Sequence, residues 1–477
     1  MLMAAHLTPA SGPALANLDC EAALLGAIMI ENRVYDDVES IVRADDFADP
    51  VHQRIFEAIG QEIAAGRRAS PVTLEPRFAD DPGIVAFGGP GYLRSLTGSA
   101  AGLFGFKEFA SQIADLAARR RLTETLGRIV QDAGVTSEDG YRPLAEIVDE
   151  ADAAIVAAVE RRDSITHDTI GQSIDRAIAR MEEIRANAGR VGARTGIDEL
   201  DELLGGFEPG QVVIVAGRPG MGKTAVACSA ALGLARNGHG VGVFSLEMRS
   251  EELGMRMVAD LCCWRRGQWI PFDVIRDGTA TEEQFAVMRR AREHVAKWPL
   301  DVIDFPSATV ARLALSIRRT KRKMAARGQK LEVAIVDYLQ LLHPDSRTRS
   351  AYEAVSEISR ALKAMAKELG VAIVALAQLS RAVEQRDDKR PQLSDLRDSG
   401  QIEQDADAVV FLYRDEYYLA REKPKKGQED DHQARLDAAR GQISFICAKR
   451  RNGPTGTANA VYLPIYQAVR SASWRVS

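Results

Sequence analysis

The stretch Gly217-Arg218-Pro219-Gly220-Met221-Gly222-Lys223-Thr224 decides the fold class of this chain. It matches G-x-x-x-x-G-K-[ST], the loop with which nucleotide hydrolases bind phosphate groups. The glycines let backbone N–H groups point at phosphate oxygens without a Cβ in the way. Lys223 would reach the β- and γ-phosphates, and Thr224 would ligate Mg²⁺. The residues predicted to cradle a nucleoside triphosphate are therefore Gly217, Arg218, Pro219, Gly220, Met221, Gly222, Lys223 and Thr224.

The segments around this loop alternate between predicted strands and helices. Residues 211–216 form a short apolar run typical of a buried strand, and residues 225–236 are predicted to be a helix. Residues 351–369 carry apolar side chains at helical spacing and end before Gly370, a common helix terminator. Strands that alternate with helices predict an α/β domain over 195–477, with a parallel sheet flanked by helices. The other predicted strands are 241–246, 333–336, 371–377 and 408–412.

The first part of the chain is predicted to be helical. Residues 18–160 are rich in alanine and are expected to form an all-α domain after a disordered lead over 1–17. Residues 161–194 are polar and are interpreted as a linker with one helix at 170–188. An apolar stripe on this helix is formed by Ile174, Ile178, Met181 and Ile184. That stripe either packs on its own chain or docks on a neighbouring subunit, and the sequence leaves both interpretations open.

Composition is that of a globular protein without a membrane span. The chain has 477 residues, of which 46% are hydrophobic and 27% charged, so two or three domains are expected. The net charge of −5 means that any nucleic-acid site must be a local basic surface. The five cysteines lack zinc-binding spacing and indicate reduced thiols. Without a signal-peptide pattern or an apolar run of spanning length, a cytoplasmic protein is expected.

Three polar residues follow predicted strands at the edge where α/β sheets bind ligands. Asp337 ends one strand and is the natural carboxylate for Mg²⁺. Because Tyr338 follows it, the base that activates water must come from elsewhere, and Glu247 at the end of another strand is the candidate. A surface or helix-capping carboxylate is the alternative for Glu247, which its position disfavours. Gln378 could sense the γ-phosphate or cap its strand, and position leaves both roles open.

A predicted hairpin tip carries a run of cations. Lys449, Arg450 and Arg451 follow a predicted strand and precede Gly453. Such a tip could place a cation on the γ-phosphate of a neighbouring subunit, as arginine fingers do. Taken alone, these residues favour the alternative of a solvated charged turn.

A second basic segment joins two strands at the ligand edge of the sheet. It begins at Lys389 and contains Arg397, Asp398 and Gly400. Glycine beside arginine suits a loop that brings backbone N–H groups and a cation to a phosphodiester. A further basic stretch, 318–323, lies on a predicted helix and has the pattern of a solvated face.

The order and spacing of these motifs resemble the replicative DNA helicase family DnaB throughout the C-terminal part. The segment 395–407, Asp-Leu-Arg-Asp-Ser-Gly-Gln-Ile-Glu-Gln-Asp-Ala-Asp, is an especially specific match. The N-terminal part resembles the family mainly at 21–28, 46–47, 52–58 and 88–93. The other matching segments are Gly210 to Thr224, Ser245 to Met248, Val336 to Leu341, Ala377 to Arg381, Lys389 to Asp415 and Lys449 to Gly456.

The resemblance implies a homohexameric ring of RecA-like domains that hydrolyses ATP between subunits with Mg²⁺. It implies movement from 5′ to 3′ on single-stranded DNA at the replication fork, with primase and a helicase loader as partners. The helical collar over 18–160 would contact primase, and helix 170–188 would dock on the next subunit. The roles implied for single residues are Walker-B acid for Asp337, base for Glu247, γ-phosphate sensor for Gln378 and trans-acting cations for Lys449 and Arg451. The implied DNA contacts are Arg397, Asp398 and Gly400, with Arg381 and Lys389 as weaker candidates.

Some residues depart from the family pattern, and other functions compete. Gly220 stands where the family usually has Ser, and Asp398 where Glu is commoner. Residues 261–279, with Cys262-Cys263-Trp264, match poorly, and the polar insertion 423–439 is expected to be a surface loop with a helical piece. A RecA- or RadA-type recombinase, a protein-binding ATPase ring and a phage-like helicase paralogue are the alternatives. The helical N-terminal part argues against the recombinase, and the loop 397–400 argues against the protein-binding ring.

Overall fold

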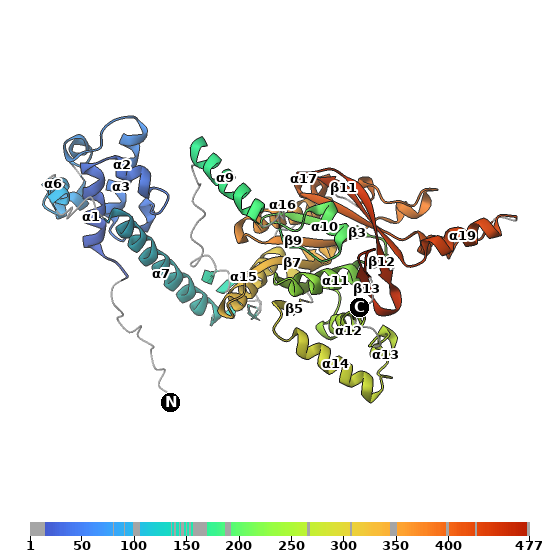
Figure 1. Cartoon of the computed structure of the whole chain (residues 1–477). Coiled ribbons are helices and arrows are strands. Elements are labelled where there is room, and N and C mark those ends of the chain that lie inside the picture. The colour runs from blue at the N-terminus through green and yellow to red at the C-terminus, as the bar shows by residue number, and fades with distance from the viewer. Residues whose placement is uncertain are drawn as a thin grey trace, which may run out of the picture. The chain divides into compact units, whose positions relative to one another are not determined.

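The computed structural model divides the chain into two compact units, Met1–Thr169 and Ile170–Ser477 (Figure 1). Each unit has its own hydrophobic core. The residues that the structure describes are 15–79, 81–89, 91–98, 105–134, 136–137, 140–142, 144, 147–148, 150–151, 154–155, 169–186, 192–264, 268–305, 308–343, 351–396, 400–424 and 427–474.

The first unit is a group of helices around α1, as predicted, but residues 18–160 are not all-α, because β1 and β2 pair as a short antiparallel sheet after α7. Leu24, Leu25 and Ile28 of α1 are fully buried, and α1 packs against α2, α3, α6 and α7. Asn17 begins α1 by accepting a hydrogen bond from the Cys20 N–H at 3.0 Å. The elements are α1 (Leu18–Ile30), α2 (Arg33–Val38), η1 (Ala44–Asp46), α3 (Pro50–Ala64), α4 (Pro71–Leu74), η2 (Glu75–Arg77), α5 (Pro82–Ala86), α6 (Gly91–Gly98), α7 (Phe106–Ala133), β1 (Thr136–Ser137) and β2 (Gly140–Tyr141).

The second unit is built on a nine-stranded sheet with the order β13-β12-β11-β10-β3-β9-β7-β4-β5. All strands from β10 to β5 run parallel, which confirms the predicted α/β class. The strands of this unit are β3 (Val212–Gly217), β4 (Gly240–Ser245), β5 (Leu300–Asp304), β6 (Ala308–Thr309), β7 (Leu331–Asp337), β8 (Leu342–His343), β9 (Ala372–Gln378), β10 (Ala408–Tyr413), β11 (Gln442–Arg450), β12 (Gly456–Leu463) and β13 (Ala468–Arg470). β6 and β8 pair separately as a small parallel sheet.

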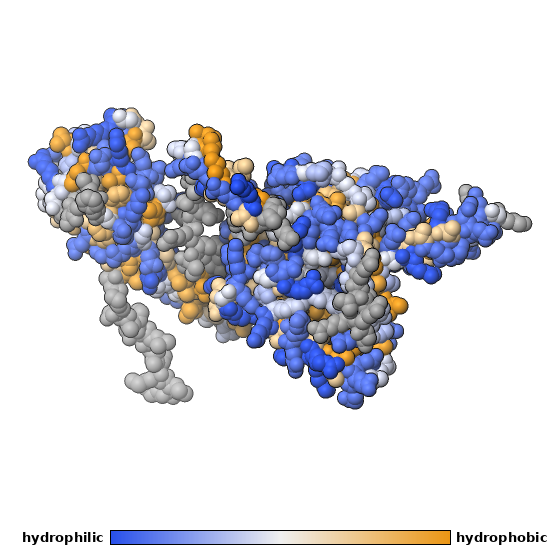
Figure 2. All heavy atoms as spheres, in the orientation of Figure 1, coloured by the Kyte–Doolittle hydropathy of each residue, from blue (hydrophilic) through white to orange (hydrophobic). Residues whose placement is uncertain are grey.

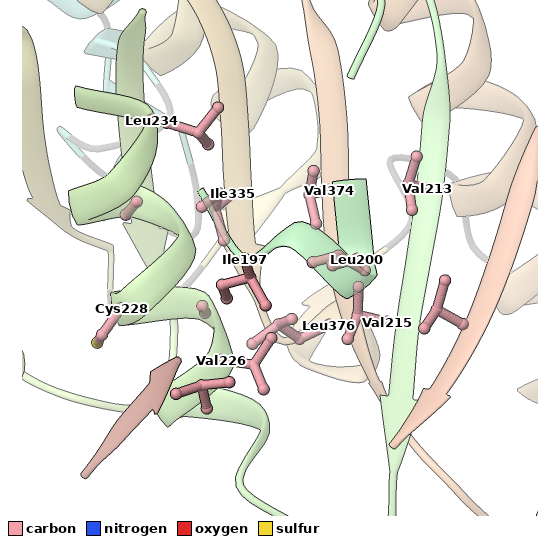
Figure 3. Packing of buried hydrophobic residues seen from close by; sticks show 14 of the residues in the cluster. Ile197, Leu200, Val213, Val215, Val226, Cys228, Leu234, Ile335, Val374 and Leu376 are labelled. Atoms are coloured by element: carbon pink, nitrogen blue, oxygen red, sulfur yellow. The ribbon is translucent and has the colours of Figure 1, made fainter. Parts of the chain in front are cut away.

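Helices cover both faces of the sheet because successive residues of a strand point to opposite sides. Val213 and Val215 of β3 pack on one side with α10, α11 and α12, and Ile214 packs on the other with α15 and α16. Figure 3 shows the first of these clusters, in which Leu200, Val226 and Leu234 meet the strand residues. The helices are α9 (Ile170–Ala186), α10 (Asp198–Leu204), α11 (Lys223–Arg236), α12 (Ser250–Cys262), α13 (Phe272–Arg276), α14 (Glu282–Val295), α15 (Val310–Ala326), η3 (Leu339–Leu341), α16 (Ala351–Leu369), η4 (Arg381–Gln385), η5 (Leu393–Asp395), α17 (Gly400–Asp405), α18 (Asp415–Leu419), α19 (Glu429–Ala439) and η6 (Pro464–Tyr466).

The sheet continues beyond β10 as three antiparallel strands, of which the sequence predicted only the hairpin formed by β11 and β12. β11 pairs with β10 and β12, and β12 pairs with β13. β11 and β12 form the predicted hairpin, but β11 extends to Arg450, so Lys449 and Arg450 lie in the strand and the turn begins at Arg451. The insertion over 423–439 lies between β10 and β11 and carries α19 (Figure 1).

A buried ion pair lies beside the segment 261–279, which departs from the family pattern. Asp260 of α12 is fully buried and bonds to Arg470 of β13 at 2.5 Å and to the indole N–H of Trp264 at 3.0 Å. Burial raises the pKa of both the Cys262 and the Cys263 thiol to about 11, so these thiols stay protonated. Asp260 and Arg470 therefore tie the end of α12 to β13, and the two cysteines that follow Asp260 are core residues.

The helix α9 exposes the apolar face that its spacing predicts. Its side chains Ile170, Ile174, Ile178 and Met181 are 78%, 50%, 49% and 67% exposed (Figure 2). No described helix of the chain is long and apolar enough to cross a membrane. Ile184 of the predicted stripe is half-buried, so within the described part of the chain the exposed apolar surface runs from Ile170 to Met181.

Candidate active site at the phosphate loop

The phosphate loop joins β3 to α11, and two glycines give it its shape. Gly220 and Gly222 have φ angles of 82° and 90°, in the left-handed region that costs a residue with a Cβ about 1–2 kcal/mol. The Met221 side chain is 1% exposed and anchors the loop in the core. Gly222 is also the N-cap of α11, so unpaired N–H groups of the first helical turn face the loop. The backbone is therefore already arranged to bind an anion.

Two loop side chains meet the carboxylate predicted for Mg²⁺. The Lys223 ammonium donates to the Gly217 carbonyl at 3.0 Å, and the Thr224 hydroxyl donates to the Asp337 carboxylate at 3.2 Å. Burial lowers the pKa of Lys223, while the charges of Asp337 and Glu247 act in the opposite direction. A buried ammonium beside an anion-binding backbone is suited to hold phosphate oxygens.

Asp337 is a buried carboxylate that lacks a full countercharge. Its side chain is 2% exposed, and burial, followed by repulsion from Glu247, raises its pKa to about 6. The Thr224 hydrogen bond and Lys223 act against this rise but do not cancel it. The folded protein therefore carries an unfavourable charge above pH 6 that a bound cation would relieve.

Asp337→Asn is expected to stabilise the nucleotide-free protein at neutral pH. The folded-state pKa of about 6 lies above the ordinary value of 3.8, so the free energy of unfolding falls as pH rises between these values. The substitution should therefore raise the free energy of unfolding above pH 6 by up to about 3 kcal/mol, and should raise it little near pH 4. Urea unfolding of both proteins at the two pH values measures this, and an equal change at both would contradict it.

The ends of neighbouring strands bring Glu247 and Gln378 to the same edge as the loop. Ser245, the last residue of β4, pairs with Asp337, and Glu247 follows two residues later as an exposed side chain. The Glu247 charge contributes to the raised pKa of Asp337. Gln378 ends β9 beside Gly217 of β3 in the parallel register. Its backbone accepts from and donates to the Gln340 side chain at 3.0 and 3.2 Å.

The phosphate-loop motif did not predict the contacts of the Arg218 side chain. It is 8% exposed and donates to the Leu379 carbonyl and to Glu384, each at 2.8 Å. Loop residues of this motif bind phosphate through their backbone, so the position predicts nothing about where this guanidinium points. The contact ties the loop to the segment that follows β9.

Lys449 and Arg451 lie at the opposite end of the parallel strands from Lys223. Arg450, between them, pairs through Ala408 with Val213 of β3, which is four residues, or about 13 Å, before Gly217. The Lys449 ammonium donates to the backbone carbonyls of Glu403, Gln404 and Ala406 at the end of α17. Arg451 is 59% exposed and lies 3.6 Å from Asp407. Within one chain, the structure does not bring these two cations to the phosphate loop.

The predicted DNA-contacting residues fall on the segment between β9 and β10. Arg381 begins η4 and is exposed, and Gly400 begins α17. The Lys389 ammonium donates to the Arg386 carbonyl at 3.2 Å and lies 5.9 Å from the Tyr418 ring centre. The two remaining predictions, Arg397 and Asp398, lie outside the described residues.

Sequence reasoning missed an aromatic group beside the loop. The Tyr417 ring lies so close that a Cβ at Gly220 would meet it at 2.7 Å, so a larger residue at this position would require the ring to move. Arg414 donates to the Gly220 carbonyl at 3.1 Å and lies 4.4 Å from the Tyr462 ring centre. The Tyr-Arg-Asp-Glu-Tyr-Tyr run at 413–418, directly after a predicted strand, was the available signal.

Comparisons with known proteins identify the same protein family in both units of the chain. Residues 192–471 match the family model of the DnaB-like helicase C terminal domain, and residues 14–115 match that of the DnaB-like helicase N terminal domain. The Replicative DNA helicase DnaB of Rickettsia prowazekii is 34% identical over 461 residues, which cover 94% of this chain and 92% of the relative. That of Geobacillus stearothermophilus is 34% identical over 453 residues, covering 94% and 93%.

Two solved structures are similar as well. A structure described as a DnaB-like replicative helicase and its interactions with primase aligns with a TM-score of 0.62 and 30% identity, and covers 96% of this chain and 100% of that one. A second structure, described as an ATPase domain, aligns with a TM-score of 0.54 and 35% identity over 63% of this chain and 99% of that one. With matching family models over both units and relatives that span nearly its whole length, the chain belongs to the DnaB family of replicative DNA helicases, which are ATP-dependent enzymes.

Proposed function

We propose that this chain is one subunit of a homohexameric ring that hydrolyses ATP at subunit boundaries. The ring would move from 5′ to 3′ on single-stranded DNA and open the duplex at the replication fork. One observation carries the proposal: the phosphate loop with Asp337 stands at one end of the parallel strands, and the exposed Arg451 stands at the other. Two ends of one sheet can complete one site only when two subunits meet.

Mg²⁺ is proposed as the ion that enters with ATP. Thr224 and Asp337 offer a hydroxyl and a carboxylate 3.2 Å apart, and the raised pKa of Asp337 marks a carboxylate that a cation would stabilise. No group of three or more His, Cys, Asp or Glu side chains suited to a metal occurs in the described part of the chain. Mg²⁺ characteristically takes one or two carboxylates and fills its shell with phosphate and water, so this small donor set fits it.

The residues at the phosphate loop are proposed to have separate roles in ATP hydrolysis. Lys223 would neutralise the β- and γ-phosphates, with the loop backbone from Gly217 to Thr224 as the cradle. Glu247 would accept the proton of the attacking water, and Gln378 would sense the γ-phosphate. Phosphoryl transfer needs positioned cations and a base more than covalent chemistry, which is what this arrangement provides.

Arg451 and Lys449 are proposed to act across the subunit boundary. Arg451 has its guanidinium 3.6 Å from Asp407 and is largely exposed, so it can exchange this partner for a γ-phosphate of the neighbour. Lys449 donates hydrogen bonds to three carbonyls at the end of α17. It would either release these bonds to reach the neighbour's phosphate, or keep them and hold Arg451 in position.

The ring contact is proposed to be the apolar face of α9 in a hydrophobic groove of the next subunit. A groove of about 590 Å³ is formed by α12, α13 and α14, with the lining residues Gly254, Met255, Val258, Ile275, Phe285, Met288, Arg289, Arg292 and Glu293. Apolar helix faces and apolar grooves of this kind bury one another in helix-in-groove contacts. This assignment makes residues 161–194 the linker between a collar over 18–160 and the ATPase domain over 195–477.

DNA is proposed to contact the segment between β9 and β10 through Arg397, Asp398 and Gly400, with Arg381 and Lys389 nearby. Cations and backbone N–H groups bind the phosphodiester chain without reading its sequence. The relative solved with primase supports primase as a partner of this chain. A helicase loader and a cytoplasmic location complete the proposal.

The test is unwinding of a forked duplex. The purified protein is expected to separate a fork with a 5′ single-stranded tail when ATP and Mg²⁺ are present. It should fail when EDTA removes Mg²⁺ or when the fork carries only a 3′ tail. Lys223→Ala, which removes the phosphate-binding ammonium, serves as the control. ATP turnover without strand separation on any fork would instead favour a recombinase or a protein-binding ATPase ring.

A further inference from the structure

A buried arginine connects the phosphate loop to the segment after β9. Arg218 donates to the Leu379 carbonyl at 2.8 Å and to Glu384 at 2.8 Å. The Leu379 N–H donates to the Gly217 carbonyl at 3.4 Å, and that same carbonyl accepts from Lys223 at 3.0 Å. The loop and this segment are therefore joined directly beside the Lys223 ammonium, which is proposed to bind the phosphates.

The same segment is held at its other end next to the predicted DNA loop. The Ser380 N–H donates to the Asp395 carbonyl at 2.9 Å, and Arg386 makes two hydrogen bonds to the Asp395 carboxylate at 3.0 and 2.7 Å. Asp395 is 3% exposed and stands two residues before Arg397. Residues 379–396, here called the bracing segment, thus run between the two sites.

The Arg218 guanidinium cannot be displaced alone. A buried charge without its partners is strongly unfavourable, so Arg218 stays bonded when the loop shifts. Its partners, the Leu379 carbonyl and Glu384, both belong to the bracing segment. A shift of the phosphate loop on ATP binding or phosphate release therefore has to move the bracing segment or break these bonds.

We propose that Arg218 and Glu384 form a positioning pair that couples the nucleotide state of the phosphate loop to DNA binding by the segment between β9 and β10. The pair takes no part in bond breaking. The proposal rests on the proposed function, because it presumes that the chain binds both ATP and single-stranded DNA. Coupling of this kind is reciprocal, so DNA should change ATP turnover and ATP should change DNA affinity through the same contact.

The test uses the full-length assembled protein and the variant Glu384→Gln, which keeps the side-chain size and removes the charge. Glu384 is 44% exposed, so the fold should tolerate the change. ATP turnover without DNA should stay within about twofold of the wild type, while stimulation by single-stranded DNA should fall about fivefold or more, the lower end of usual coupling between sites. The ratio of DNA dissociation constants with an ATP analogue and with ADP should shrink in parallel.

Two further variants sharpen the test. Asp387→Asn removes an exposed carboxylate of the bracing segment that is absent from the Arg218 contact, and should behave as the wild type. Adding Arg218→Lys to Glu384→Gln should lower DNA stimulation no further, because both changes act on one contact.

Retained DNA stimulation in Glu384→Gln, or an equal fall of basal and stimulated turnover, would overturn the coupling role. A wild-type protein that DNA does not stimulate would count against the proposed function itself.

Discussion

Glu247→Gln is expected to bind ATP as tightly as the wild type and to hydrolyse it about 10²–10⁴ times more slowly, the usual contribution of a general base. The amide cannot accept the proton of the attacking water. The change also removes one of the charges that raise the pKa of Asp337, so this carboxylate should stay ionised and available to Mg²⁺ at neutral pH. ATP binding at equilibrium and hydrolysis in a single turnover measure the two effects separately.

The matched control for this substitution is Glu251→Gln, which removes another exposed carboxylate in the first turn of α12. Its turnover should equal that of the wild type. Near-normal turnover in Glu247→Gln would remove Glu247 as the base. A parallel loss of ATP binding would show that Glu247 supports the site in the ground state.

Arg451→Ala is expected to lower ATP turnover of the assembled ring by about 10³–10⁵, the usual effect of losing an arginine finger. The guanidinium would stabilise charge on the γ-phosphate of the neighbouring subunit, because within its own chain it stands at the far end of the sheet from Lys223. Steady-state turnover of the ring measures this. Arg440→Ala, which removes an exposed cation two residues before β11 begins, is the control.

Mixing two inactive variants tests whether Arg451 acts on the site of a neighbouring subunit or on the site of its own subunit. Rings of Arg451→Ala alone and of Asp337→Asn alone should both be inactive. In a mixed ring, an Arg451→Ala subunit keeps its own Asp337 and can receive Arg451 from an Asp337→Asn neighbour, so activity should partly return. Absence of any recovery in rings shown to be mixed would place Arg451 in its own subunit's site.

Local sequence patterns predicted the elements that form the site. Strand, glycine loop and helix around 211–236 were readable because the loop geometry depends on glycines at set positions and the strand on a short apolar run. The helix 351–369 is observed with the predicted bounds, because its apolar stripe and terminal glycine are local features. The carboxyl ends of parallel strands share an edge, so Asp337, Glu247 and Gln378 could be grouped before their distances were known.

Pairings between distant residues were not predictable from these patterns. Arg218 and Glu384 are 166 residues apart in the chain, and Arg470 and Asp260 are 210 apart. The sequence contains many acidic and basic residues, and composition does not say which of them form ion pairs with each other. Burial and the packing of β9 and β13 select the partners that are observed. The contact of Tyr417 with Gly220 was equally unpredictable, because it joins α18 to the distant phosphate loop.

By itself, the sequence determined the α/β class, the phosphate loop, the carboxylates at the strand ends and the kinship with replicative helicases, since all of these depend on local order and spacing. Only the tertiary structure decided that Lys449 binds the end of α17, that Arg451 stands far from its own phosphate loop and that Arg218 is bonded to the segment after β9. The physical reason is that a side chain's partner depends on which elements pack together and how much water they exclude, and neither is encoded within one stretch of the chain.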